Sequence, residues 1–415
     1  MNATERFLRY ATIPTRSDPD STATPSTDCQ FSLARLLADE LTALGLTNVR
    51  VTDNCFVYAA LPATPGLEGQ PCLGLIAHMD TAPDYPGEGV KPQLHPNYDG
   101  GDIVLSATGA VLSPARFPSL NGLKGKTLIT TDGSTLLGAD DKAGVAEIMT
   151  ALERVIASGR AHGPVAVAFT PDEETGLGIA GFDVEGFGAA YAYTVDGGEV
   201  GELSYENFNA CEATLDFRGV NVHPGSAKDT MVNACLLAME YNAMLPSAET
   251  PRHTEGYEGF FHLQELHGKV EQAKMVYIIR DHSMTRFQER KALFRKAAEE
   301  MNRRYGDGTV EAEVEDQYYN MYEVLKDRME IVALAEEAMR AAGVDNPTHS
   351  PIRGGTDGCM LTYKGLLCPN LPSGGHNAHG RFEFAPVESL KTGVRTVKAL
   401  VSPELLEQVI LKKEC

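Results

Sequence analysis

The stretch VAVAFTPDEETG, residues 165–176, joins an apolar run directly to three consecutive acids and ends at a glycine. The short run 165–169 is typical of a strand in a sheet that is covered on both faces. Acids at the end of a buried strand repel one another unless a positive group lies between them. The stretch therefore suggests a cation site at the end of a strand, with a solvated acidic turn as the alternative.

The three acids are predicted to have different tasks. Glu173 and Glu174 are neighbours, so on an extended backbone their side chains would point to opposite sides. This favours two separate roles over one shared role. Asp172 is interpreted as a solvated or capping acid.

The segments around this strand indicate an α/β fold. Strands are predicted within 48–53, 55–61, 72–80 and 189–198, and helices within 4–12, 31–45 and 138–158. Strands that alternate with helices predict a sheet with helices packed on it, whose strand ends carry the chemistry.

The pattern changes near residue 207. The segment ACEATLDFRG alternates polar and apolar residues, as an antiparallel strand with one covered face does. A helix, two strands, a charged helix over 284–304 and a final strand near 310 follow, which is the order of a ferredoxin-like α+β layer. We therefore predict an α/β, mixed-sheet catalytic domain over 1–207 and 318–415, with an inserted lid or dimerisation domain over 208–317.

Composition excludes several classes of protein. The chain has 415 residues, a formal net charge of −21 and a pI of about 4.9, so nucleic acid and anionic membranes are poor partners. No N-terminal apolar core of a signal peptide and no apolar run of the ~18 residues that a membrane span needs is found. The eight cysteines form no C-x-x-C pair, which favours free thiols in the cytoplasm. They are Cys29, Cys55, Cys72, Cys211, Cys235, Cys359, Cys368 and Cys415.

Residues that can bind a metal recur at or just after the ends of the apolar segments. Nitrogen and oxygen ligands without thiolates favour zinc, cobalt or manganese, and zinc is the commonest where histidine and carboxylate mix. His78 and Asp80 are two residues apart, so on a strand they share a face, and Asp80 can accept the imidazole N–H that does not bind the metal. The candidates are His78, Asp80, Asp140, Asp141, Glu173, Glu174, Asp196, His376 and His379.

The motifs H-x-D, G-A-D-D, D-E-E-T-G, V-D-G-G and a late histidine, in this order, resemble the co-catalytic zinc metallopeptidases that include aminoacylase and glutamate carboxypeptidase. The resemblance extends along nearly the whole chain. Segments such as LLGADDKAG, PIRGGTDG and CPNLPSGGHNAHGRFEF resemble the tripeptide aminopeptidases of that family most closely.

The resemblance implies two zinc ions per subunit and assigns a role to each site residue. It implies a cis peptide bond between Asp140 and Asp141. His376 remains an alternative to His379 as a ligand. In the implied arrangement His78 and Asp196 hold one zinc, Glu174 and His379 hold the other, Asp140 bridges them, Asp80 orients His78, and Glu173 is the general base.

Three residues outside these motifs are also candidates. His223, in NVHPGSAKD, resembles the histidine of the family that stabilises an oxyanion, although a loop histidine is the alternative. Arg280, in YIIRDH, and Arg353, in PIRGGTDG, resemble residues that bind a peptide carboxylate. Ordinary surface ion pairs are the alternative for both arginines.

Together these observations predict a cytoplasmic, homodimeric zinc aminopeptidase that removes the N-terminal residue of tripeptides. A deacylase or dipeptidase of the same family is an alternative, distinguished by whether a free amino terminus is required. A catalytically silent zinc-binding scaffold is another. Glu173 argues against the scaffold, because a scaffold needs no base beside its metal ligands.

Overall fold

A computed structural model describes residues 1–410, and Cys415 lies outside the described residues. The chain divides into two compact units. Unit 2 includes the short segment 351–355, which the sequence pattern assigned to the catalytic part. Unit 1 comprises Met1–Tyr205, Val324–Ser350 and the chain from Thr356, and unit 2 comprises Glu206–Glu323 and Pro351–Gly355.

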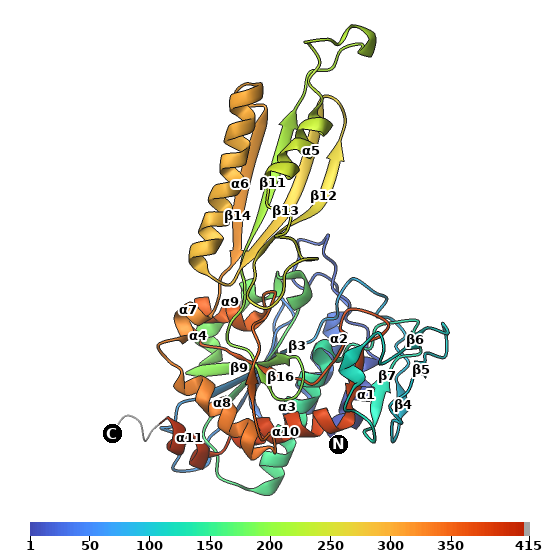
Figure 1. Ribbon diagram of the computed structural model, residues 1–415. Coiled ribbons are helices and arrows are strands. Elements are labelled where there is room, and N and C mark those ends of the chain that lie inside the picture. The colour runs from blue at the N-terminus through green and yellow to red at the C-terminus, as the bar shows by residue number, and fades with distance from the viewer. Residues whose placement is uncertain (411–415) are drawn as a thin grey trace. The chain divides into compact units, whose positions relative to one another are not determined.

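Unit 1 is built on a six-stranded mixed sheet, which confirms the predicted fold class (Figure 1). The three neighbouring strands β8, β3 and β9 are parallel, and β16 adds a parallel edge, whereas β2 runs antiparallel to both of its neighbours, β8 and β1. The spatial order is β1 (Thr47–Val51), β2 (Val57–Leu61), β8 (Val165–Thr170), β3 (Leu73–His78), β9 (Tyr191–Gly197) and β16 (Asn370–Pro372).

Helices cover both faces of this sheet, as the apolar run 165–169 predicted. Val167 and Phe169 belong to one hydrophobic core and Ala166 and Ala168 to the other, because successive strand residues point to opposite faces. The first core includes residues of α1 (Ala3–Ala11), α2 (Gln30–Ala43), α3 (Ala139–Ser158), α8 (Glu330–Ala341), α10 (Val387–Leu400) and α11 (Pro403–Val409), and the second is shared with α4 (Val184–Phe187) and α9 (Asp357–Tyr363).

A small β region that the sequence pattern did not predict supports two site loops. A three-stranded sheet joins β17 (Phe384–Pro386), β7 (Leu128–Thr130) and β4 (Gln93–His95), beside a hairpin of β5 (Ile103–Val104) and β6 (Val111–Leu112). β17 follows the loop with His379, and β7 precedes the loop with Asp140. Because β17 and β7 are paired, this sheet holds one end of each loop beside the other. Unit 1 also contains the parallel pair β10 (Glu202–Leu203) and β15 (Thr348–His349), and the 3₁₀-helices η1 (Pro118–Leu120), η2 (Glu173–Thr175) and η3 (Gly178–Gly181).

Unit 2 has the strand–helix–strand–strand–helix–strand order that the sequence indicated. Its antiparallel sheet has the spatial order β12-β13-β11-β14, which is the ferredoxin-like arrangement. Its hydrophobic core joins alternate strand residues to α5 and α6. The elements are β11 (Asn209–Arg218), η4 (Pro224–Ser226), α5 (Ala234–Met244), β12 (Phe260–Gly268), β13 (Gln272–Asp281), α6 (Met284–Tyr305) and β14 (Val310–Tyr318), and α7 (Tyr322–Leu325) links the units.

Two features of composition can be compared with the structure. The seven cysteines in the described part of the chain are all free. Among residues 1–410, no helix combines the length and the apolar character needed to cross a bilayer.

Candidate metal centre

The carboxyl ends of three neighbouring parallel strands place the candidate ligands at one edge of the sheet. β3 ends at His78, β9 carries Asp196 near its end, and β8 leads within four residues to Glu173 and Glu174. Parallel α/β sheets build their sites at this edge because all the strand ends meet there.

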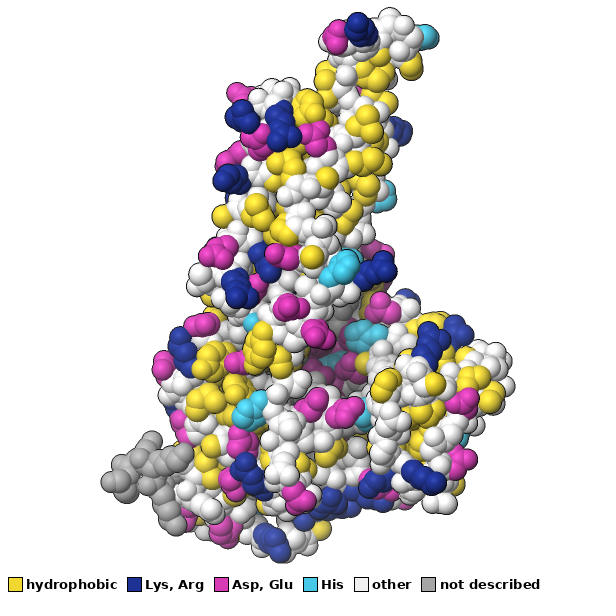
Figure 2. Space-filling view, in the orientation of Figure 1, with side chains coloured by type: hydrophobic (Ala, Val, Ile, Leu, Met, Phe, Trp, Pro, Cys, Tyr) yellow, Lys and Arg dark blue, Asp and Glu magenta, His cyan; other side chains and the backbone are white. Residues whose placement is uncertain are grey.

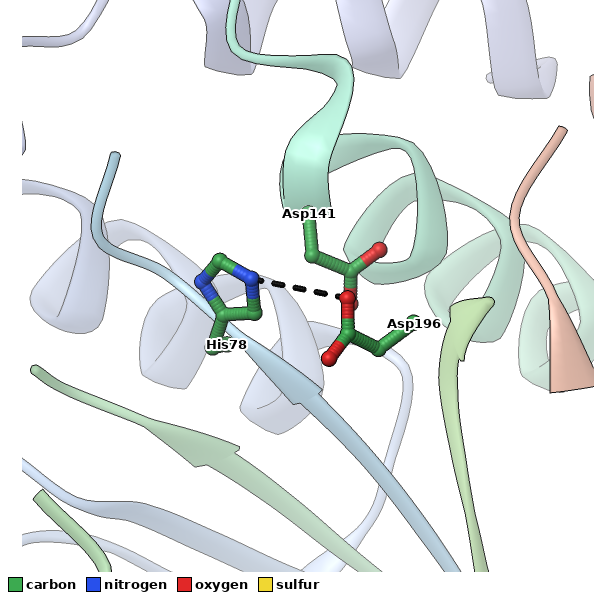
Figure 3. Close-up of side chains that lie close together, drawn as sticks. All are labelled: His78, Asp141 and Asp196. Atoms are coloured by element: carbon green, nitrogen blue, oxygen red, sulfur yellow. Dashed lines mark ion pairs between the residues drawn. The ribbon is translucent and has the colours of Figure 1, made fainter. Parts of the chain in front are cut away.

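The first group of side chains surrounds His78. Its Nε2 lies 2.9 Å from Oδ1 of Asp140 and 3.6 Å from Oδ1 of Asp196. Figure 3 shows the imidazole and the Asp196 carboxylate facing each other, with the carboxylate of Asp141 beside them. These side chains come from β3, β9 and the start of α3, and their atoms are close enough to ligate one ion.

The second group surrounds His379. Its Nε2 lies 2.9 Å from Oε2 of Glu174 and 3.4 Å from Oδ2 of Asp140. The two oxygens of Asp140 therefore face different histidines, Oδ1 facing His78 and Oδ2 facing His379. The structure thus brings together all five residues that the sequence proposed as ligands, with Asp140 between the two groups.

His376, the alternative ligand, lies elsewhere in unit 1. Its Nδ1 is 3.4 Å from Oε1 of Glu199, and its ring stacks on Phe384 with 4.6 Å between centroids. The geometry therefore places His379, rather than His376, beside Asp140 and Glu174.

Asp80 connects His78 to the acidic turn. Its fully buried carboxylate accepts hydrogen bonds from the backbone N–H groups of Glu173, at 3.0 Å, and Glu174, at 3.2 Å. Its Oδ1 also lies 3.3 Å from Nδ1 of His78. One carboxylate can therefore orient the imidazole and the turn together.

The turn itself differs from the expected extended segment. Glu173 and Glu174 lie on the 3₁₀-helix η2, so the backbone rotates between their side chains. The interpretation of Asp172 as a solvated or capping acid was wrong. Asp172 is fully buried and makes no capping bond, and its carboxylate accepts bonds of 2.6 Å from the Ser26 N–H and the Gln30 side-chain amide. It is buried because the loop before α2 packs on the end of β8.

Asp141 belongs to the site, although the resemblance gave it no role. The peptide bond between Asp140 and Asp141 is cis, as the resemblance implied. Oδ1 of Asp141 accepts from the Gly144 N–H at 3.2 Å, and a Cβ at Gly144 would lie only 1.9 Å from the Val195 carbonyl oxygen. Only glycine therefore fits beneath this carboxylate. In the sequence, the second aspartate of the GADD motif was the feature from which a place for Asp141 in the site could have been predicted.

The electrostatics of the site call for positive charge. Burial raises the pKa of Glu174 to about 7 and the pKa of Asp196 to about 6. Burial and the charge of Asp196 raise the pKa of Glu173 well above its usual range. Hydrogen bonds to Asp140 and Glu174 raise the pKa of His379 to about 11. Buried acids of this kind are usually neutralised by cations.

The residues present fit a pair of zinc ions. The donors are imidazole nitrogens and carboxylate oxygens, the combination that zinc accepts in hydrolytic sites. Among the described residues, Oε1 of Glu174 is buried without a hydrogen-bond partner, as an oxygen reserved for a metal would be. On the face of unit 1 that Figure 2 shows, acidic and histidine side chains gather beside a hollow.

The three remaining candidates lie in unit 2. His223 is exposed, and its Nδ1 accepts from the Gly225 N–H at 3.1 Å. Arg280 donates to the carbonyl oxygens of Cys211 and Ile279 and to the side chain of Gln317. Arg353 donates to carbonyl oxygens of the segment 254–258. Because these partners are uncharged, the alternative of surface ion pairs for the two arginines was wrong.

Comparisons with known proteins agree with this site. Residues 132–402, well over half of the chain, match the model of peptidase family M20/M25/M40. The chain belongs to this family. It is 51% identical over 403 residues to a protein named peptidase T from Alkaliphilus oremlandii, covering 96% of this chain and 98% of that protein. It is 53% identical over 399 residues to peptidase T from Desulfitobacterium hafniense, covering 96% and 97%. This M20/M25/M40 member is therefore a hydrolase of the metallopeptidase class, an aminopeptidase.

Solved structures share the fold of this M20/M25/M40 member. The aminopeptidase PepT from Bacillus cereus superposes with a TM-score of 0.76 at 22% identity, over 96% of this chain and 97% of that one. The YXEP protein of Bacillus subtilis, described as a dinuclear metal-binding peptidase, has a TM-score of 0.65 at 13% identity, over 98% of each chain. At these identities the similarity establishes the fold alone.

Proposed function

We propose that the protein is a cytoplasmic, zinc-dependent aminopeptidase that releases the N-terminal residue of tripeptides. The observation that carries the proposal is Asp140, whose two oxygens face His78 and His379 as those of a ligand shared by two ions would. The motifs that resemble tripeptide aminopeptidases support the substrate class. The seven free thiols in the described part of the chain support a reducing compartment.

The proposed ligands divide into two sets. His78 and Asp196 would hold one zinc, Glu174 and His379 the other, and Asp140 both. When bound, the pair of ions would polarise the scissile carbonyl and lower the pKa of water.

Glu173 would be the general base of the reaction. It adjoins the ligand Glu174 on the turn that Asp80 fixes through two backbone hydrogen bonds. From this position its carboxylate would take the proton of the attacking water and return it to the leaving nitrogen.

His223 would stabilise the oxyanion through Nε2. Its Nδ1 accepts the Gly225 N–H, so in the neutral imidazole the proton lies on Nε2, which can donate.

A single peptide series tests the proposed function. Hydrolysis would be measured for a dipeptide, a tripeptide, a tetrapeptide and an N-acetylated tripeptide, with added zinc and with a chelator. We expect the tripeptide to be cleaved fastest, the acetylated peptide to resist, and the chelator to abolish activity. Preference for the acetylated peptide would indicate a deacylase, preference for the dipeptide a dipeptidase, and no hydrolysis at all a scaffold.

Arg280 is the stronger candidate for binding the far carboxylate of a tripeptide. Among the described residues its guanidinium uses three of its five donors, whereas the guanidinium of Arg353 uses four. Both arginines lie in unit 2, because Arg353 is bound to the segment 254–258. A fixed cation would select peptide length, since an extended chain advances ~3.3 Å per residue.

Replacing Arg280 by glutamine should therefore lower kcat/KM for tripeptides by about 10–100-fold, the loss of one charge-assisted hydrogen bond. Dipeptides, whose carboxylate does not reach the arginine, should lose much less. Arg353→Gln should have a smaller effect in the same direction. Arg218→Gln, an exposed arginine of unit 2 that pairs with Glu311, is the control and should change neither rate. An unchanged ratio of tripeptide to dipeptide cleavage in both variants would exclude these arginines as the length selector.

We further propose a homodimer that forms through unit 2. The sheet of this unit ends in β12 and β14, and an edge strand offers unpaired backbone groups to a second copy. Sedimentation of the purified protein tests this proposal, with twice the mass of the chain as the expected result and a monomer at all concentrations as the opposite one.

A further inference from the structure

Glu383 is a buried carboxylate that touches the loop carrying Asp140. It lies four residues after His379, immediately before β17, and its side chain is 1% exposed. Its Oε2 accepts hydrogen bonds from the N–H groups of Leu137, at 2.7 Å, and Gly138, at 2.8 Å. Its Oε1 accepts from the N–H of Asp140 at 3.1 Å. Both oxygens of one side chain are therefore bound to the backbone of a single short segment.

These bonds satisfy the backbone of the turn that leads into α3. Gly138 has a left-handed backbone with φ 75°, and Asp140 and Asp141 are non-helical, so the regular part of the helix begins after Asp141. Asp141 caps it, because its Oδ1 accepts from the Gly144 N–H at 3.2 Å. The N–H groups of the preceding turn lack such a local acceptor, and Glu383 supplies it from about 245 residues away in the sequence.

The same contact connects two proposed metal ligands. Asp140 is on the segment that Glu383 holds, and His379 is on the loop from which Glu383 projects. His379 Nε2 and Asp140 Oδ2 are 3.4 Å apart, and the hydrogen bonds of Glu383 connect the two segments that carry these residues. No other side chain of the described residues accepts from the Leu137, Gly138 or Asp140 N–H groups.

We propose that Glu383 is a positioning residue that holds Asp140 against His379 and so fixes the spacing of the two metal ions. This inference rests on the proposed two-metal function. Because both oxygens of the carboxylate accept from backbone N–H groups, we assign it no place as a metal ligand or as a substrate contact. Its three bonds to main-chain N–H groups instead fix the backbone from which the bridging ligand projects. Lys142, one turn into α3, adds a buried positive charge that attracts Glu383.

Glutamine cannot reproduce this arrangement, although it has nearly the same shape. A carboxylate accepts at both oxygens, whereas an amide has one oxygen and one NH₂ group. In Glu383→Gln the NH₂ group must face either the Asp140 N–H or the pair of N–H groups at Leu137 and Gly138. The glutamine NH₂ group and a backbone N–H group, both donors, then face each other in a buried place. The segment 137–140 must shift to separate them.

The test is zinc affinity, measured by competition with a chromogenic chelator for both equivalents of zinc. We expect Glu383→Gln to bind both equivalents 10–100-fold more weakly, the range known for residues that orient ligands. With zinc in excess, we expect kcat to stay below the wild-type value while KM changes little. Glu388→Gln is the matched control, because Glu388 also accepts a backbone N–H, that of Thr127 at 3.1 Å, away from the ligands. It should keep wild-type affinity and kcat.

Glu383→Asp provides a second variant if the glutamine protein does not fold, as judged by circular dichroism of the metal-free protein. Aspartate keeps the charge but is too short to reach all three N–H groups, so weakened zinc binding is again expected. Wild-type affinity in either folded variant overturns the inference. Loss of folding in both, with Glu388→Gln folded, also overturns it, because Glu383 would then be needed only for stability. A wild-type protein that binds fewer than two zinc ions would refute the proposed function itself.

Discussion

Replacing Glu173 by glutamine is expected to lower kcat by ~10²–10⁴-fold and to leave the metal content unchanged. Glutamine keeps the size of the side chain but cannot take a proton from water. The turn should keep its shape, because Asp80 binds the backbone N–H of this residue and not its side chain. The measurement is kcat with a saturating tripeptide, together with metal analysis of the same sample.

Glu174→Gln is the matched control, because it makes the same chemical change at the next residue. Oε2 of Glu174 lies 2.9 Å from His379 Nε2, and its Oε1 is buried with no hydrogen-bond partner among the described residues. This variant should lose part of its metal, and its kcat should recover in part when zinc is added. If Glu173→Gln loses metal and Glu174→Gln keeps it, the two roles have been exchanged.

Replacing Asp140 by asparagine should weaken the binding of both metal ions by at least ~100-fold, because even residues that only orient a ligand contribute 10–100-fold. Asparagine retains one oxygen and therefore cannot accept an ion on each side. Activity at limiting zinc should fall with the metal content. Chelator competition, followed by kcat/KM at the same free zinc concentration, measures both effects.

Asp132→Asn serves as the control for this variant. Asp132 is an aspartate of unit 1 that is 4% exposed, and its Oδ1 accepts from the backbone N–H of Ser134 at 2.9 Å. The substitution should leave zinc affinity unchanged. Loss of only one of the two ions in Asp140→Asn would show that Asp140 belongs to one site and does not bridge.

Much of the site could be predicted because its residues follow strand ends. His78 and Asp196 lie at the ends of β3 and β9, where the apolar pattern of the sequence already placed them. The burial of Asp172 could not be predicted from strand ends. Its partners, Ser26 and Gln30, are more than 140 residues away and give no local signal. Asp172, beside Glu173 and Glu174, was therefore predicted to be solvated although it is buried.

Long-range backbone contacts limited the prediction of unit boundaries as well. Arg353 packs with unit 2 because its guanidinium donates to carbonyl oxygens of the segment 254–258, almost 100 residues earlier. Backbone acceptors carry no sequence signature. The contacts of Glu383 could not be predicted for the same reason, because its partners are three backbone N–H groups. The short strands β4, β5, β6 and β7 were missed because two or three residues show no periodicity.

The most direct test of the two-metal account is anomalous diffraction at the zinc edge from crystals grown with zinc. The account predicts two peaks on opposite sides of the Asp140 carboxylate, one beside His78 and Asp196 and the other beside Glu174 and His379. A single fully occupied peak in a protein with full tripeptidase activity would contradict it.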